Sequence, residues 1–100
     1  MEKSRDFSFG VVNGRLELHG RLDYSNSPEF HRGCHQVFDS ASGDKLIVDC
    51  QNLNYIDSAG VCALISLHER AQQTGTSLHM RNCSRSVRHV LGLLRIGTFS

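Results

Sequence analysis

The chain has 100 residues, of which 39% are hydrophobic and 21% charged, and its formal net charge is +1. These values predict a single soluble domain over residues 1–100 whose core needs no metal or disulfide to fold. The near-neutral charge argues against a nucleic-acid binder that works through a strong phosphate field. No apolar run approaches the roughly 18 residues of a membrane helix. Because the N-terminus also lacks a secretion signal, we expect a cytoplasmic protein that does not insert into membranes.

The first predicted element is a β-hairpin. Phe7–Val11 and Arg15–His19 both alternate apolar and polar residues, and Asn13-Gly14 between them is a strong two-residue turn signal. We expect Leu16 and Leu18 on the buried face of this hairpin.

The next segment predicts a helix that begins at Pro28, with Ser27 as its N-cap, and ends at Gly43. Its apolar residues recur at helical spacing and form a single stripe: Phe30, Cys34, Val37, Phe38 and Ala41. We expect this stripe to belong to the core.

The centre of the chain changes from a strand pattern to a helix pattern. Leu46–Val48 is an unbroken apolar run, typical of a strand that is buried on both faces of a parallel sheet. From Val61 onward the apolar residues follow helical spacing. Asp57 and Ser58, both favourable N-cap residues, lie between the two patterns. The sequence therefore predicts a strand, a short loop and the start of a helix.

The last third predicts a strand at Ser77–Met80 and a final helix capped by Ser84 and ended by Gly97. The buried stripe of that helix is expected to consist of Val87, Val90, Leu91 and Leu94. A strand, crossover helix and strand of this length imply a right-handed β-α-β unit with parallel pairing. The predicted fold class is α/β: a mixed sheet begun by the hairpin and covered by three to four helices.

The cysteines and histidines leave little room for metal or disulfide chemistry. None of the four cysteines forms a C-x-x-C pair, and their apolar neighbours favour buried, reduced thiols: Cys34, Cys50, Cys62 and Cys83. His31 and His35 are spaced four apart, which can bind metal, but such pairs are more often surface residues. We predict no cofactor and no metal site.

Ser58 is the residue whose side chain has the clearest possible functional role. The first turn of a helix presents unpaired backbone N–H groups and the positive end of the helix dipole, which favour an anion such as a phosphate. Asp57 beside it would oppose that charge. A plain capping role for the Asp57-Ser58 pair is the alternative. A serine hydrolase would need Gly where this chain has Ile56, and no histidine is placed by the sequence to serve Ser58.

Four segments resemble the STAS domains, the family of bacterial anti-sigma factor antagonists. They are Gly20-Arg21-Leu22-Asp23, Pro28-Glu29-Phe30, Ile56-Asp57-Ser58-Ala59-Gly60-Val61 and Val87-Arg88-His89-Val90-Leu91. The similarity covers roughly residues 7–97 in the order expected for the family. Many members have a second Ser where this chain has Ala59, which leaves Ser58 as the single acceptor of the loop.

The resemblance implies a regulatory switch and no catalysis by the chain itself. In the family, the serine that matches Ser58 is phosphorylated by a partner that is both kinase and anti-sigma factor, and a phosphatase removes the group. The unphosphorylated form binds the kinase and frees the sigma factor. Carried over to this sequence, Ser58 is the phosphoacceptor, while Asp23, Tyr55, Asp57, Ala59 and Gly60 form the switch and partner-binding surface.

Two other settings of the fold remain open. One is an accessory subunit of a lipid-transport ABC system, and the other is a sensor that binds a nucleotide or lipid beside Asp23 and Asp57. The oligomeric state is also open between a monomer and a weak dimer.

Overall fold

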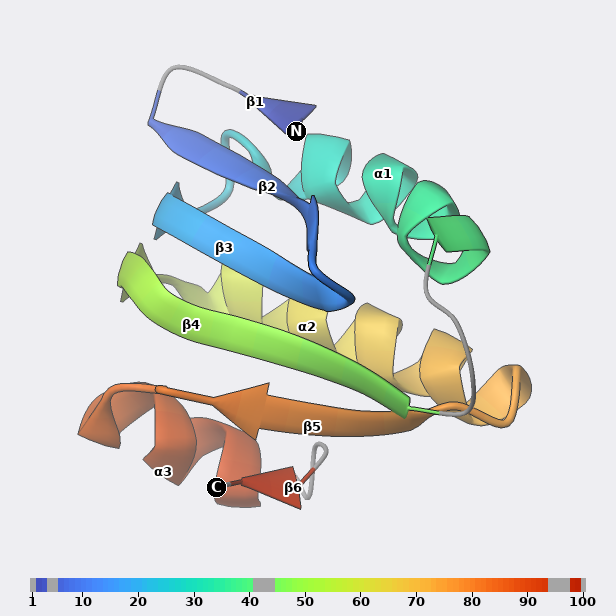
Figure 1. Ribbon diagram of the computed structural model, residues 1–100. Helices are drawn as coiled ribbons and strands as arrows, with labels where there is room; N and C mark the ends of the chain where they lie inside the picture. Colours follow the sequence, from blue (N-terminus) through green and yellow to red (C-terminus); the bar gives the residue numbers. More distant parts are fainter. Residues whose placement is uncertain (1, 4–5, 41–44, 94–97, 100) are drawn as a thin grey trace.

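The structure, a computed structural model, describes residues 2–3, 6–40, 45–93 and 98–99. These residues form three helices and a six-stranded sheet whose strands follow one another in chain order (Figure 1). The strands are β1 (Glu2–Lys3), β2 (Phe7–Val12), β3 (Arg15–Leu22), β4 (Lys45–Ile56), β5 (Ser77–Arg81) and β6 (Thr98–Phe99). The helices are α1 (Ser27–Ser40), α2 (Ser58–Gln73) and α3 (Arg85–Leu93).

The predicted hairpin is confirmed. β2 and β3 pair antiparallel, from Phe7 opposite Gly20 to Val12 opposite Arg15. Asn13 and Gly14 form the turn with φ values of 52° and 78°. A two-residue turn of this type needs positive φ at both central residues, which Asn and Gly tolerate best. β1 extends the sheet by pairing antiparallel with β2.

The remaining pairs, from β3 to β6, are parallel. Each connection in this part of the chain contains a helix, and α1 and α2 lie side by side behind the sheet in Figure 1. Strands added in one direction by right-handed crossovers place their helices on the same face. The predicted α/β class and the parallel β-α-β unit are both confirmed.

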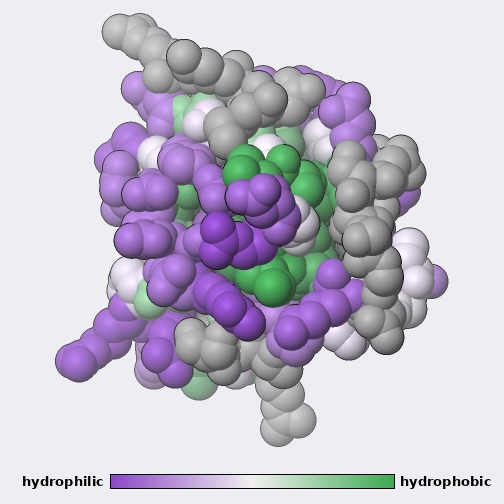
Figure 2. Space-filling view, viewed as in Figure 1, coloured by the Kyte–Doolittle hydropathy of each residue, from purple (hydrophilic) through white to green (hydrophobic). Residues whose placement is uncertain are grey.

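The core fills the space between the sheet and the helices. Phe30 of α1 meets the rings of Phe7 and Phe9 edge-on, with centroids 5.8 and 5.0 Å apart. Leu16 and Leu18 point into the same core and are fully buried, as predicted. The opposite face of the sheet is open. Figure 2 shows polar residues over most of that side of the molecule, around an apolar patch.

β4 is much longer than the predicted strand Leu46–Val48. It has 12 residues because β3 pairs with it as far as Ile56, whereas β5 stops pairing at Asp49. Two register shifts in the β3–β4 pair disturb the alternation of exposed and buried side chains. The second half of β4 therefore has no apolar run that marks it as a strand.

Several other predictions were wrong in detail. α1 begins at Ser27, one residue earlier than predicted, because the Asn26 carbonyl accepts its first helical hydrogen bond from Phe30 N–H. Val90 is 40% exposed, because it faces the space between α3 and α2. All four cysteines were expected to be buried, but Cys62 is exposed and Cys83 is half-buried. The four thiols are free, as expected. The predictions for the side chains of Phe38, Ala41 and Leu94, and for the helix ends at Gly43 and Gly97, lie outside what the structure describes.

Within the described residues, no helix combines the length and the apolar character that a bilayer crossing requires.

Candidate functional site: the junction of β4 and α2

Asp57 holds the junction together with both of its carboxylate oxygens. It is the N-cap of α2, and its Oδ1 accepts the backbone N–H of Gly60 at 2.9 Å. Its Oδ2 accepts the backbone N–H of Tyr24 at 3.0 Å, which ties α2 to the loop after β3. The Asp57 N–H donates in turn to the Leu22 carbonyl at 3.3 Å. The capping role predicted for Asp57 is confirmed, and it includes a second loop that sequence reasoning did not foresee.

Asp23 lies in that second loop, at the same end of the sheet. Its Oδ1 accepts the N–H and the hydroxyl of Ser25, at 3.0 and 2.6 Å. The hydroxyl bond of Ser25 is the main cause that lowers the pKa of Asp23. The Asn26 side chain closes the loop by accepting Asp23 N–H and donating to the Arg21 carbonyl. Two carboxylates therefore lie on adjoining loops, and both also accept hydrogen bonds from main-chain N–H groups.

Ser58 is the first residue of α2, and its side chain is exposed. In the part of the chain that the structure describes, no hydrogen bond engages its hydroxyl. The backbone beneath is closely packed, because a Cβ atom at Gly60 would lie 2.5 Å from the Leu22 carbonyl oxygen and 2.6 Å from Ile56 Cγ1. Ala59 next to it is half-buried. The junction thus presents a free hydroxyl on a rigid support at the positive end of a helix.

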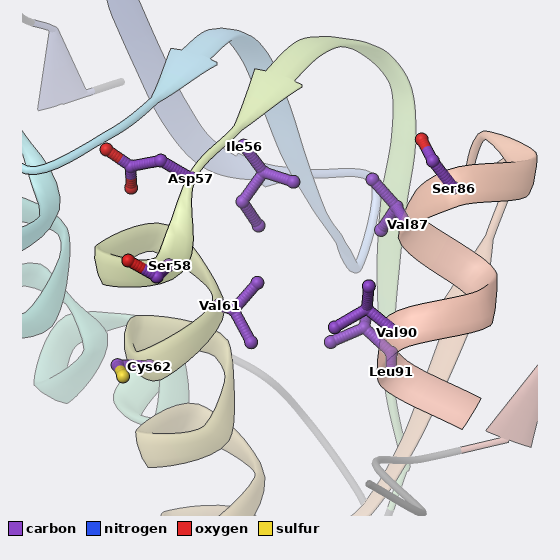
Figure 3. A pocket seen from close by; sticks show the side chains of 9 residues that line it. All are labelled: Ile56, Asp57, Ser58, Val61, Cys62, Ser86, Val87, Val90 and Leu91. Carbon is purple, nitrogen blue, oxygen red and sulfur yellow. The ribbon is translucent and has the colours of Figure 1, made fainter. Parts of the chain in front are cut away.

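An apolar groove of about 440 Å³ separates α2 from α3 beside this hydroxyl. In Figure 3, Ile56 and Val61 point across it toward Val87, Val90 and Leu91 of α3. The Ser58 hydroxyl and the Cys62 thiol lie on the side of α2 away from α3 in the same view. Because Ser58 is also among the residues that line the groove, a macromolecule that covers Ser58 would meet the groove as well.

Two exposed tyrosines lie near this end of the sheet. Tyr55 is 43% exposed, and the Arg21 guanidinium lies 4.0 Å from its ring centroid. Tyr24 is 77% exposed and belongs to the loop that Asp57 anchors. Sequence reasoning missed Tyr24, although its place directly after the strand that ends at Leu22 was a usable signal. Exposed tyrosines supply large contact area at low entropic cost, which suits them to interfaces.

The expected lack of a metal site and of a cofactor stays a prediction. Among the described residues, no three His, Cys, Asp or Glu side chains come together as a metal site. The side chain of His35 lies outside the described residues, so the spacing of His31 and His35 stays untested.

A model of the family described as "Mlab, STAS domain" matches residues 6–99 of the chain. The chain belongs to the STAS domain family. A STAS-domain containing protein of Pseudomonas aeruginosa (strain UCBPP-PA14) is 26% identical over 78 residues, which cover 78% of this chain and 75% of that protein.

Solved structures share the fold of this STAS domain. The anti-sigma factor antagonist SpoIIAA in its unphosphorylated form superposes with a TM-score of 0.73 at 15% identity, over 94% of this chain and 86% of that chain. The Bacillus SpoIIAA in its phosphorylated form gives a TM-score of 0.68 at 17% identity, over 94% and 90%. At these identities the likeness establishes the common architecture.

Proposed function

We propose that this STAS domain is an anti-sigma factor antagonist that is switched by phosphorylation of Ser58. The unphosphorylated form binds an anti-sigma factor that is also a serine kinase, and thereby releases a sigma factor or another output. The kinase inactivates the domain by phosphorylating Ser58, and a phosphatase restores it. The observation that carries this proposal is the exposed Ser58 hydroxyl on the fixed first turn of α2. The chain is a substrate in this scheme and does not act as an enzyme.

The fold likeness supports the proposal. SpoIIAA is an anti-sigma factor antagonist with an unphosphorylated and a phosphorylated form. In the present chain Ala59 follows Ser58, so the loop from Asp57 to Gly60 offers a single hydroxyl. A kinase acting on this loop would therefore modify one defined atom, Ser58 Oγ.

The partner-binding surface surrounds that hydroxyl. We assign to it Asp23, Tyr55, Asp57, Ala59 and Gly60, and we add Tyr24 because of its exposure and its bond to Asp57. The tyrosines serve as contact anchors, and the small residues after Ser58 let a partner approach the helix start closely. Asp23 and Asp57 hold the loops in place and make the surface acidic.

The effect of phosphorylation follows from charge. A phosphoryl group changes the local charge by about −1.5 to −2, next to two carboxylates. A partner docked there meets like-charge repulsion and the desolvation of an unpaired dianion, which costs several kcal/mol. The affinity therefore falls by about a thousandfold or more. Because Asp57 already caps α2, the block needs no change of fold.

The direct test is incubation with ATP and the anti-sigma kinases of the host organism, followed by intact-mass measurement. We expect one phosphoryl group per chain, which Ser58→Ala abolishes. Ser86→Ala is the matched control, because Ser86 is an exposed serine near the start of α3 that lines the same groove. It should leave the mass gain unchanged. Absence of any mass gain, together with co-purification of a transport ATPase, would replace this proposal by the role of a lipid-transport subunit.

A further inference from the structure

Two cysteines near the carboxyl end of β5 have no part in the proposed switch. Cys50 is 3% exposed and lies on β4, and Cys83 is half-buried in the loop between β5 and α3. The residues next to them in the chain are joined by the Asn82–Asp49 hydrogen bond at 3.0 Å, and each thiol is the largest influence on the pKa of the other. The two residues are therefore neighbours in space although the whole of α2 separates them in the chain.

The sheet brings the two thiols together. β4 and β5 pair in parallel, and the last pair in register is Asp49 opposite Arg81. Asn82 then adopts a positive φ of 59° and donates its side-chain N–H to Asp49 Oδ1 at 3.0 Å. Cys83 follows directly after this turn. Cys50 follows Asp49 and Cys83 lies two residues after Arg81, so both cysteines lie within two residues of the last pair in register.

Positive charge surrounds the outer thiol. A cavity beside Cys83 is lined by Arg85, Arg88 and His89, all exposed residues at the start of α3. The hydrogen bond from Cys50 lowers the pKa of Cys83, and Arg88 acts in the same direction, against burial and the charge of Asp49. The same bond, together with burial, raises the pKa of Cys50. An accessible thiol of lowered pKa beside cations, with a second thiol in contact, is the arrangement of a peroxide-sensitive cysteine with its resolving partner.

We propose that Cys83 is an oxidation site for hydrogen peroxide and that Cys50 resolves it to an intrachain disulfide. The Cys83 thiolate attacks one peroxide oxygen, the O–O bond breaks, and Cys83 sulfenic acid and hydroxide are formed. The Cys50 sulfur then attacks the Cys83 sulfur, the S–O bond breaks, and the Cys50 proton leaves with the hydroxyl group as water. Peroxide is reduced by two electrons and the two thiols are oxidised to one disulfide. A dithiol reductant reverses the step.

The disulfide would link β4 to the loop from which α3 begins. α3 forms one wall of the groove beside Ser58, so the bond would fix that wall against the sheet. Disulfides in reducing compartments are mostly transient and redox-sensing, which suits a regulatory protein. This inference does not depend on phosphorylation, and its test needs no kinase.

The test is brief treatment of the folded chain with hydrogen peroxide, followed by alkylation of the remaining thiols and peptide mapping. Trypsin leaves Cys50 and Cys62 in the same peptide, since no Lys or Arg lies between residues 45 and 70. A second cleavage before Asp57 separates them. We expect a Cys50–Cys83 cross-link with loss of two of the four alkylatable thiols, restored by dithiothreitol.

Three variants make the result decisive. Cys83→Ser should abolish the cross-link, and Cys62→Ser, which removes an exposed thiol on the outer side of α2, should leave it unchanged. Cys50→Ala should leave a sulfenic acid at Cys83 that dimedone traps; Cys83→Ser decides the matter alone if that core variant does not fold. Oxidation of Cys62 in preference to Cys83, or a Cys50–Cys83 bond that forms only in guanidinium, would overturn the proposal.

Discussion

The starts of α2 and α3 lie at the same edge of the sheet, but they are held very differently. α2 begins with Asp57, whose two carboxylate oxygens accept N–H groups at 2.9 and 3.0 Å from two segments of the chain. α3 begins after Ser84, whose hydroxyl accepts a single N–H, that of Val87, at 3.3 Å. Both caps follow the carboxyl end of a parallel strand. Only the first cap also joins its helix to a neighbouring loop.

This difference in capping suggests different roles for the two helix starts at this edge of the sheet. The α2 start is held by the two bonds of the Asp57 carboxylate, so the proposed phosphorylation of Ser58 would change its charge and leave the backbone in place. The α3 start is held locally by the bonds of the Ser84 hydroxyl with Val87 N–H and with the Ser86 hydroxyl, both 3.3 Å long, and indirectly by the Asn82–Asp49 bond of the preceding loop. It is therefore the wall of the groove that is easier to displace, and the one that a Cys50–Cys83 bond would fix. Substitutions at the two helix starts should therefore have unequal effects.

The largest effect is expected for a methyl group at the start of α2. Gly60→Ala places a Cβ 2.5 Å from the Leu22 carbonyl oxygen, and backbone at this distance must move. We expect the free energy of unfolding to fall by about 3 kcal/mol, as for overpacked cores, in a urea titration. Gly92→Ala is the matched control on α3, because its Cβ meets no atom within 4 Å. It should stabilise by about 0.5–1 kcal/mol. Equal effects of the two changes would refute the contrast.

Removal of the caps should give a smaller difference in the same direction. Asp57→Ala loses two hydrogen bonds and the tie between α2 and the loop of Tyr24, so we expect a loss of about 2 kcal/mol. Ser84→Ala loses one long bond to a main-chain N–H at an exposed position and should cost about 0.5 kcal/mol. Thermal and urea unfolding of both variants measure this. A greater loss for Ser84→Ala would mean that α3 has the stronger cap.

The smallest effect is expected for the loss of folding stability at acidic pH that comes from Asp49, which binds the loop before α3. Burial of Asp49 raises its pKa, but hydrogen bonds from Asn82 and Gln51 and the charge of Arg15 outweigh it and leave the pKa lowered. The folded protein thus binds this proton less readily than the unfolded chain. The stability that Asp49 supplies is complete above its ordinary pKa of about 3.9 and is lost as pH falls through the lower folded pKa.

The substitution Asp49→Asn tests whether Asp49 causes the loss of stability in this acidic pH range. Urea titrations at a series of acidic pH values should show a steeper loss of stability for the native chain than for the variant. Parallel slopes for the two proteins would exclude Asp49 as a source of the acid sensitivity.

Most of the fold was predictable because local patterns agreed with the final packing. The Asn13-Gly14 turn and the apolar stripe of Phe30, Cys34 and Val37 each determine a local conformation that the sheet then uses. The second half of β4 was not predictable, because only pairing with β3 makes it a strand. The hydrophobic periodicity of a segment does not show which other strand the segment pairs with.

The candidate site shows the same limit. Asp57 was identified as a cap from its place before an apolar helix, but its bond to Tyr24 spans a gap in sequence that only the fold closes. The nearness of Cys50 and Cys83 was missed for a similar reason, since it depends on the register of β4 with β5 and on the bond between Asn82 and Asp49. The local sequence patterns did not show which separate loops come together at one edge of the sheet.

The most direct test of the proposed switch is the affinity of the domain for the proposed anti-sigma kinase before and after phosphorylation of Ser58. Calorimetric titration should give tight binding for the unmodified chain and a loss of about a thousandfold for the Ser58-phosphorylated chain, with superposable amide spectra away from the loop. Equal affinities for the two forms, or a spectrum changed throughout the sheet, would contradict the proposal that charge at a fixed helix start controls the partner.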